Sequence, residues 1–145
     1  MIRRVVVDTN VWIRTLLGGP VSLPVLEAWR AGKFLVLISQ PLLHELEQVS
    51  ERPRLRKSID PAQKDALVEQ LRWRGEWVEA TAVPPSCRDP KDQPVLATAI
   101  SGHADVIVSG DGDLRADDSV RQEMLEYGIR IWGVKTLLTK LREGP

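Results

Sequence analysis

The stretch that decides the fold is Ile2-Arg3-Arg4-Val5-Val6-Val7-Asp8-Thr9-Asn10. Residues 2–7 are mostly β-branched and apolar and show no clear alternation with polar residues, which is typical of a strand buried on both faces. The run stops at a polar triplet, and residues 11–17 then have the pattern of a helix. A buried strand followed by a helix is the repeating unit of a parallel α/β sheet.

The rest of the chain repeats this alternation. We expect further strands at residues 35–38, 106–108 and 129–132, and a short edge strand at 77–83. We expect helices at residues 24–31, 40–49, 61–74, 89–101, 122–126 and 134–141, and a turn or a frayed helix end at 52–57. The sequence therefore predicts an α/β fold, a three-layer α/β/α sandwich around a central, mostly parallel sheet of four or five strands.

The composition is ordinary for a globular protein, and it limits the partners. The 145 residues suit one domain, and 20 basic and 20 acidic side chains give a formal net charge of zero. A nucleic acid could then be attracted only by a local basic patch or by bound metal ions. Cys87 is the only cysteine, which excludes a disulfide within the chain. With neither a membrane-spanning window nor a signal peptide in the sequence, we expect a cytoplasmic protein without membrane contact.

Two aspartates follow predicted strands directly. Asp8 stands at the carboxyl end of the first strand, and Asp111 stands just past the strand at 106–108. Ligands of open parallel sheets bind beyond the carboxyl ends of the strands, so both residues are candidates for one site. An aspartate in such a place is more often a turn or N-cap residue when it stands alone.

Two more carboxylates occupy apolar helix faces. Glu45 falls in the series Leu42, Glu45, Leu46 and Val49, and Asp92 begins the series Asp92, Val95, Leu96 and Ala99. Both series have the spacing of a single buried face. Glu45 could instead be solvated at the border of its face, and Asp92 could belong to a capping arrangement with Asp89.

Four carboxylates that converge on one edge repel one another unless a cation lies between them. No basic residue stands at the matching helical positions. Ligands that are all oxygen favour Mg²⁺ or Mn²⁺, and such ions suit phosphodiester hydrolysis because they activate water and stabilise the leaving oxygen. Gly110 and Gly112, on either side of Asp111, would let a phosphate backbone come close.

The motifs around these carboxylates resemble those of PIN-domain nucleases. They are Val5-Val6-Val7-Asp8-Thr9-Asn10, Leu42-Leu43-His44-Glu45-Leu46, Arg88-Asp89-Pro90-Lys91-Asp92 and Ile107-Val108-Ser109-Gly110-Asp111-Gly112-Asp113-Leu114. Their order, and Gly128-Ile129-Arg130-Ile131-Trp132 before a closing helix, look closest to the toxin components (VapC-like) of bacterial and archaeal toxin–antitoxin pairs. The resemblance covers essentially the whole chain and implies a single PIN domain over residues 1–145.

The resemblance also implies roles for individual residues and partners. Matched residue by residue, the quartet that binds Mg²⁺ or Mn²⁺ and cleaves RNA is Asp8, Glu45, Asp92 and Asp111, with Asp113 as a further carboxylate and Asn10 and Ser109 as supporting polar groups. The family further implies a homodimer and inhibition by a cognate antitoxin that can occupy the acidic groove. Gln93, Ser109 and Trp132 depart from the commoner residues of the pattern, which leaves the choice of substrate open.

Several features allow other interpretations. The densest basic run, Arg52, Arg54, Arg56 and Lys57, could contact an RNA backbone, although a solvated surface run is the commoner case. Core or interface packing is the default for Trp12, Trp73 and Trp77, and stacking on bases is the alternative for the last two. Rival functions are a DNA nuclease, a phosphatase, and a catalytically weak PIN-like module that binds RNA or protein. A receiver-like signalling domain would need a lysine that we cannot place.

Overall fold

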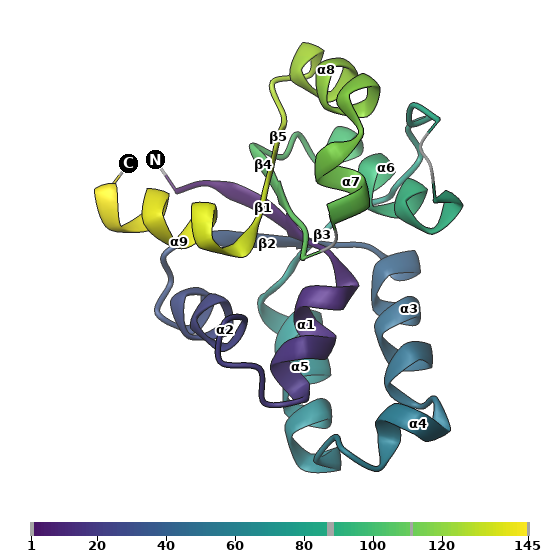
Figure 1. Cartoon of the computed structure of the whole chain (residues 1–145), viewed down its shortest axis with the longest axis vertical. Helices are drawn as coiled ribbons and strands as arrows, with labels where there is room; N and C mark the ends of the chain where they lie inside the picture. Colours follow the sequence, from purple (N-terminus) through teal and green to yellow (C-terminus); the bar gives the residue numbers. More distant parts are fainter. Residues whose placement is uncertain (1, 87–88, 111, 145) are drawn as a thin grey trace.

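The computed structural model describes residues 2–86, 89–110 and 112–144, with the backbone alone at position 113. Its centre is a five-stranded sheet in the order β3-β2-β1-β4-β5 (Figure 1). The strands are β1 (Arg4–Val7), β2 (Leu35–Ile38), β3 (Glu76–Trp77), β4 (Val106–Val108) and β5 (Arg130–Trp132). All neighbouring pairs are parallel. This confirms the predicted parallel sheet.

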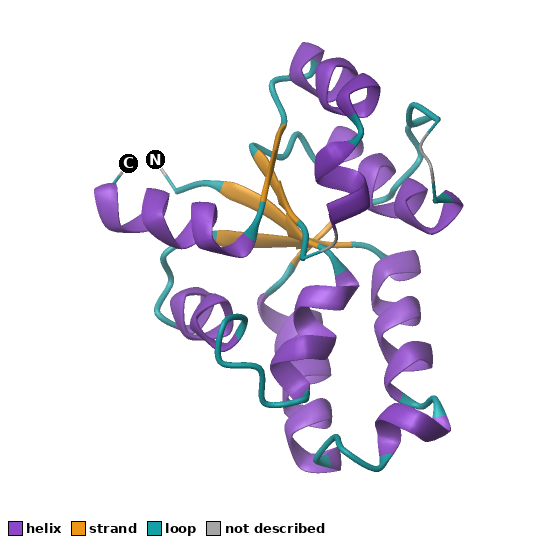
Figure 2. Cartoon of the chain, in the orientation of Figure 1, coloured by secondary structure: helices purple, strands orange, loops and turns teal. Residues whose placement is uncertain are grey.

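Helices cover both faces of this sheet, which confirms the predicted three-layer sandwich (Figure 2). α1, α2, α5 and α9 lie on one side of the sheet in Figure 1, and α6, α7 and α8 lie on the other. The helices are α1 (Thr9–Leu16), α2 (Leu23–Arg30), α3 (Gln40–Ser50), α4 (Pro53–Arg56), α5 (Pro61–Arg74), α6 (Gln93–Ser101), α7 (Gly112–Ala116), α8 (Asp118–Glu126) and α9 (Val134–Glu143). None of the described helices is long and apolar enough to span a membrane.

The order of the strands reverses between β1 and β4. The chain moves from β1 outward to β2 and β3, then returns across the sheet to pair β4 with the other side of β1. Val5, Val6 and Val7 lie opposite Val106, Ile107 and Val108 in this pairing. At such a switch point the two following connections leave on opposite faces, and a crevice opens at the carboxyl ends of the two strands. Asp8 and Ser109 are the residues that follow these two strands.

The burial of the side chains agrees with the sequence patterns that predicted these strands and helices. β1 and β4 are buried almost throughout, as their unbroken valine and isoleucine runs predict. Both helical series behave as their spacing indicates. Leu42 and Leu46 are buried beside a half-buried Glu45, while Asp92 is 7% exposed in line with fully buried Val95 and Leu96.

Some boundaries differ from the sequence-based expectation. The edge strand β3 has only two residues, since residues 79–81 turn, with the Thr81 amide bonded to the Glu79 carbonyl, instead of continuing along β2. α7 was not predicted, because its Gly-Asp-Leu-Arg-Ala sequence follows a glycine-rich stretch typical of a loop. α8 starts four residues before the expected helix, where the Asp117 side chain caps its first turn by accepting from the Val120 amide.

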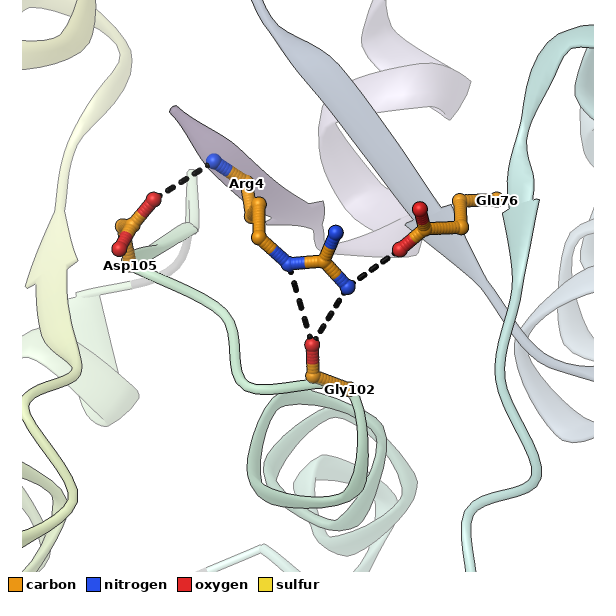
Figure 3. Close-up of polar contacts among 4 residues, drawn as sticks. All are labelled: Arg4, Glu76, Gly102 and Asp105. Carbon is orange, nitrogen blue, oxygen red and sulfur yellow. Dashed lines mark hydrogen bonds and ion pairs between the residues drawn. The ribbon is translucent and has the colours of Figure 1, made fainter. Parts of the chain in front are cut away.

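The opposite, amino-terminal edge of the sheet is held by Arg4 (Figure 3). Its guanidinium donates to the Gly102 carbonyl, with Nη2 at 2.7 Å, and forms an ion pair with Glu76. Its backbone amide donates to Asp105 at 2.8 Å. One residue therefore joins β1, the edge strand β3 and the end of α6, away from the carboxyl edge.

Candidate active site

Asp8 follows β1 directly, at the carboxyl edge of the sheet and beside β4. Its backbone amide donates to the Val108 carbonyl, which continues the β1–β4 ladder by one residue. Its carboxylate accepts a hydrogen bond of 3.1 Å from the buried Ser109 hydroxyl, and Asp8 is only 6% exposed. A serine after one strand thus orients an aspartate after the neighbouring strand. Two residues 101 positions apart in the sequence form the floor of the site.

Asn10 and Arg14 hold the turn that follows β4. The Asn10 side-chain oxygen accepts from the Gly110 amide at 3.3 Å, and the Arg14 guanidinium donates to the Gly110 carbonyl at 3.0 Å. The two side chains are four residues apart on α1, so they share one face of the helix. Sequence reasoning included Asn10 but missed Arg14, although this spacing was a signal that could have found it.

Glu45 lies on α3 and is hydrogen-bonded to Thr9, the residue after Asp8. Burial raises the pKa of its carboxyl above the ordinary value, while a hydrogen bond with the Thr9 side chain and the charges of Lys91 and Arg52 act to lower it. Asp89 acts to raise it. Lys91 and Asp89 belong to the turn that carries Asp92, so part of the charge that acts on Glu45 comes from that turn. No basic residue stands at the matching helical positions, but the charges of Lys91 and Arg52 act on Glu45 through space.

Asp92 is carried by a 3₁₀ turn, Pro90–Asp92, that leads into α6. Asp89 caps this turn, since its side chain accepts from the Lys91 amide at 3.0 Å. The interpretation of Asp89 as a cap is confirmed. The following α6 packs along α3, where the Ser39 and Thr98 hydroxyls meet at 2.8 Å in a buried contact. This contact fixes the two segments that carry Glu45 and Asp92 against each other.

The remaining predicted ligands cannot be placed in the same way. Asp111 lies outside the described residues, and so does the side chain of Asp113. Among the side chains that are described, no three acidic, histidine or cysteine groups already form a metal-binding set. The three described candidates nevertheless fit a hard cation, because all offer carboxylate oxygens, two are nearly fully buried and the third has a pKa raised by burial.

The other candidate residues lie elsewhere. Arg54, Arg56 and Lys57 are exposed on or after the short helix α4, at the far end of α3 in Figure 1, and Arg56 pairs with Glu51. Trp12 is a core residue that packs against Trp29, at a ring distance of 5.7 Å. Trp73 and Trp77 are exposed, and His44 is exposed beside Glu45.

A parallel sheet with buried carboxylates at its switch point defines a class of α/β proteins that bind their ligands at the carboxyl edge. The family comparison identifies the member of that class. Residues 4–113 match the family described as PIN domain, and the chain belongs to this family. The matched segment spans every predicted acidic position from Asp8 to Asp113.

A solved structure supports the fold. The chain is similar to one in the crystal structure of VapBC2 from Rickettsia felis bound to a DNA fragment from their promoter. The TM-score is 0.58 at 15% sequence identity, over 90% of this chain and 98% of the other. No curated protein matches the chain.

Proposed function

We propose that this protein is a metal-dependent endoribonuclease of one PIN domain, residues 1–145, that acts as the toxin of a toxin–antitoxin pair. The observation that carries the proposal is the position of Asp8, Glu45 and Asp92. All three are buried or half-buried residues of a PIN-domain fold, and their carboxylate oxygens suit a hard divalent cation.

The residues that would hold Mg²⁺ or Mn²⁺ are Asp8, Glu45, Asp92, Asp111 and Asp113. When bound, the ion supplies an activated water and stabilises charge on the leaving oxygen of a phosphodiester. The protein's own contribution is to orient the ligands. Ser109 orients Asp8, and Thr9 and Lys91 act on Glu45. Asn10 keeps the turn after β4 in place.

The biological setting is proposed from the motifs. Their resemblance to the toxin subgroup supports a cytoplasmic homodimer with an RNA substrate and a cognate antitoxin, and the likeness to VapBC2 is in keeping with it. Co-expression with the product of a small neighbouring reading frame should yield a stable complex in which RNA cleavage is suppressed.

The activity is tested with purified protein, Mg²⁺ or Mn²⁺, and three substrates: single-stranded RNA, single-stranded DNA and a small phosphate ester. We expect RNA to be cleaved only with metal. Asp8→Asn and Asp92→Asn should each lower cleavage at least about 100-fold. The loss of a residue that only hydrogen-bonds to a metal ligand already costs about 10–100-fold, and these two residues are proposed as the ligands themselves. Circular dichroism and melting temperature should show that both variants remain folded.

Other outcomes would assign the rival functions. Cleavage of DNA or of the ester in preference to RNA would keep the metal site and change the substrate. RNA binding without turnover, retained in both aspartate variants, would indicate the weak binding module instead.

A further inference from the structure

A cleft of about 820 Å³ lies next to the acidic edge, by which we mean the carboxyl edge of the sheet where Asp8 follows β1. Ser109 and Gly110 form the border between the two, since both line the cleft while Ser109 also binds Asp8. The other walls come from the loop after α1, from α7 and from the start of α9. Its volume is within the range of small-ligand sites. The cleft is therefore the space into which a polynucleotide would run from the acidic edge on this side.

The charged residues that line the cleft, as far as the structure describes them, are all basic. Among the described residues, its charged side chains are Arg14, Arg115 and Lys135, and all three are exposed. The protein as a whole has no net charge, so this is a local concentration of positive charge. It lies beside the acidic edge, where a polyanion would otherwise be repelled.

Glycines bring the two arginines into the cleft. A side chain at Gly110 would collide with the Arg14 guanidinium, and a Cβ at Gly133 would lie 2.7 Å from Nη1 of Arg115. Each guanidinium thus lies directly against backbone at a position where any larger residue would push it away. Planar guanidinium groups held in this manner are suited to phosphate oxygens.

The start of α9 adds backbone donors. Gly133 is its N-cap and has no side chain to bond the first turn, and the first helical bond is from the Leu137 amide to the Gly133 carbonyl at 3.1 Å. The amides of Val134, Lys135 and Thr136 precede that bond, and these residues line the cleft. Aliphatic side chains also line the cleft, where Leu17 and Val21 are 40% and 53% exposed.

We propose that this cleft binds the RNA backbone immediately beside the cleaved bond, with a phosphate on Arg14, Arg115, Lys135 and the α9 amides, and the attached nucleoside against Leu17 and Val21. The inference rests on the proposed ribonuclease function and names how that site takes its substrate. The cleft suits RNA better than an acidic protein segment because it is continuous with the acidic edge. A polynucleotide must continue past the bond that is cut, and the cleft is where it would continue.

The test measures binding separately from cleavage. In an Asp92→Asn background, fluorescence anisotropy follows a labelled single-stranded oligouridylate across a salt series. Lys135→Glu should weaken binding at least about 10-fold at low salt and lower the slope of log K against log salt by roughly 0.7 for each phosphate that is no longer neutralised. The substitution places an acid in the first turn of α9, which the helix dipole favours, so the helix itself should not be harmed.

Two further variants keep the result interpretable. Lys33→Glu makes the same charge change at an exposed position before β2, at the opposite edge of the sheet, and should alter binding less than about 2-fold. Gly133→Ala keeps a backbone conformation open to alanine, since φ is −80° and ψ 171°, and should weaken binding by displacing Arg115. Mg²⁺-induced stabilisation, measured without the Asp92 change, should persist in Lys135→Glu.

Equal weakening in Lys33→Glu, or unchanged RNA binding in Lys135→Glu and Gly133→Ala, would overturn the cleft assignment. So would an effect of Lys135→Glu confined to the binding of a protein partner. Failure of the proposed function has a different signature, in which the wild-type protein neither cleaves RNA nor responds to Mg²⁺ or Mn²⁺.

Discussion

Ser109 acts on the site through its hydrogen bond to Asp8. Removal of its hydroxyl should weaken metal binding while the protein stays folded. In Ser109→Ala, the Asp8 carboxylate loses an orienting donor, so we expect a loss of about 10–100-fold in Mn²⁺ affinity or in RNA cleavage. Titration of Mn²⁺ and kcat/KM for RNA measure this effect. Ser119→Ala, at an exposed position on α8, is the matched control. Unchanged metal affinity in Ser109→Ala would show that Asp8 needs no such support.

Glu45 should make stability depend on pH in the metal-free protein. Burial raises its folded-state pKa above the ordinary 4.5, so at neutral pH its charge disfavours the folded state. Glu45→Gln should therefore melt higher than the wild type at pH 7. The difference should shrink as the pH falls through the raised pKa and vanish below the ordinary one, where the carboxyl is neutral in both states.

The same variant should lose the response to metal. Mg²⁺ should raise the melting temperature of the wild type and leave that of Glu45→Gln nearly unchanged, because ligand binding to the folded state is what stabilises it. A variant that melts lower than the wild type without metal would contradict the assigned cause of the pKa shift.

At the scale of elements, one buried polar pair joins Ser39, the residue before α3, to Thr98 on α6. The Thr98 hydroxyl donates its only hydrogen to the Pro94 carbonyl at 2.7 Å, so Ser39 must be the donor in the Ser39–Thr98 bond. Thr98→Val would leave the Ser39 hydroxyl buried without this acceptor and should cost about 1–3 kcal/mol. Urea unfolding measures the cost, and Ser39→Ala in the same protein should recover part of it. Strictly additive effects would mean that the pair does not couple the helices.

The elements also show what the sequence could predict. The helix at residues 61–74 was placed correctly because Asp60 and Pro61 mark its start and Gly75 marks its end, and β1 was placed correctly because an unbroken run of valines is buried on both faces. α7 was missed because its start looks like a glycine-rich turn, and β3 was overextended because its partner β2 is only four residues long. Contacts such as the Ser109–Asp8 hydrogen bond join separate elements, and no periodicity within one helix could reveal them.

At the scale of the whole molecule, the carboxyl edge of the sheet carries the candidate site, and the amino-terminal edge contributes to stability. A substitution of Arg4 tests whether these two roles are separate. Arg4→Met removes the bonds to the Gly102 carbonyl and the ion pair with Glu76 at the amino-terminal edge. We expect a decrease of about 1–3 kcal/mol in unfolding free energy and nearly unchanged kcat/KM below the melting transition. Chemical denaturation and an RNA cleavage assay check the two parts. A large decrease of activity in the folded variant would show that the edges are coupled.

The switch point between β1 and β4 has a consequence for the newborn protein. A polypeptide still leaving the ribosome already contains Asp8, Glu45 and Asp92, yet until Val106, Ile107 and Val108 emerge and dock beside β1 it has no crevice and no Ser109 to steady the first aspartate. The proposed nuclease activity would thus be absent until synthesis has passed β4. Under the proposed toxin function, this order of synthesis gives the antitoxin time to be present before the proposed site is assembled.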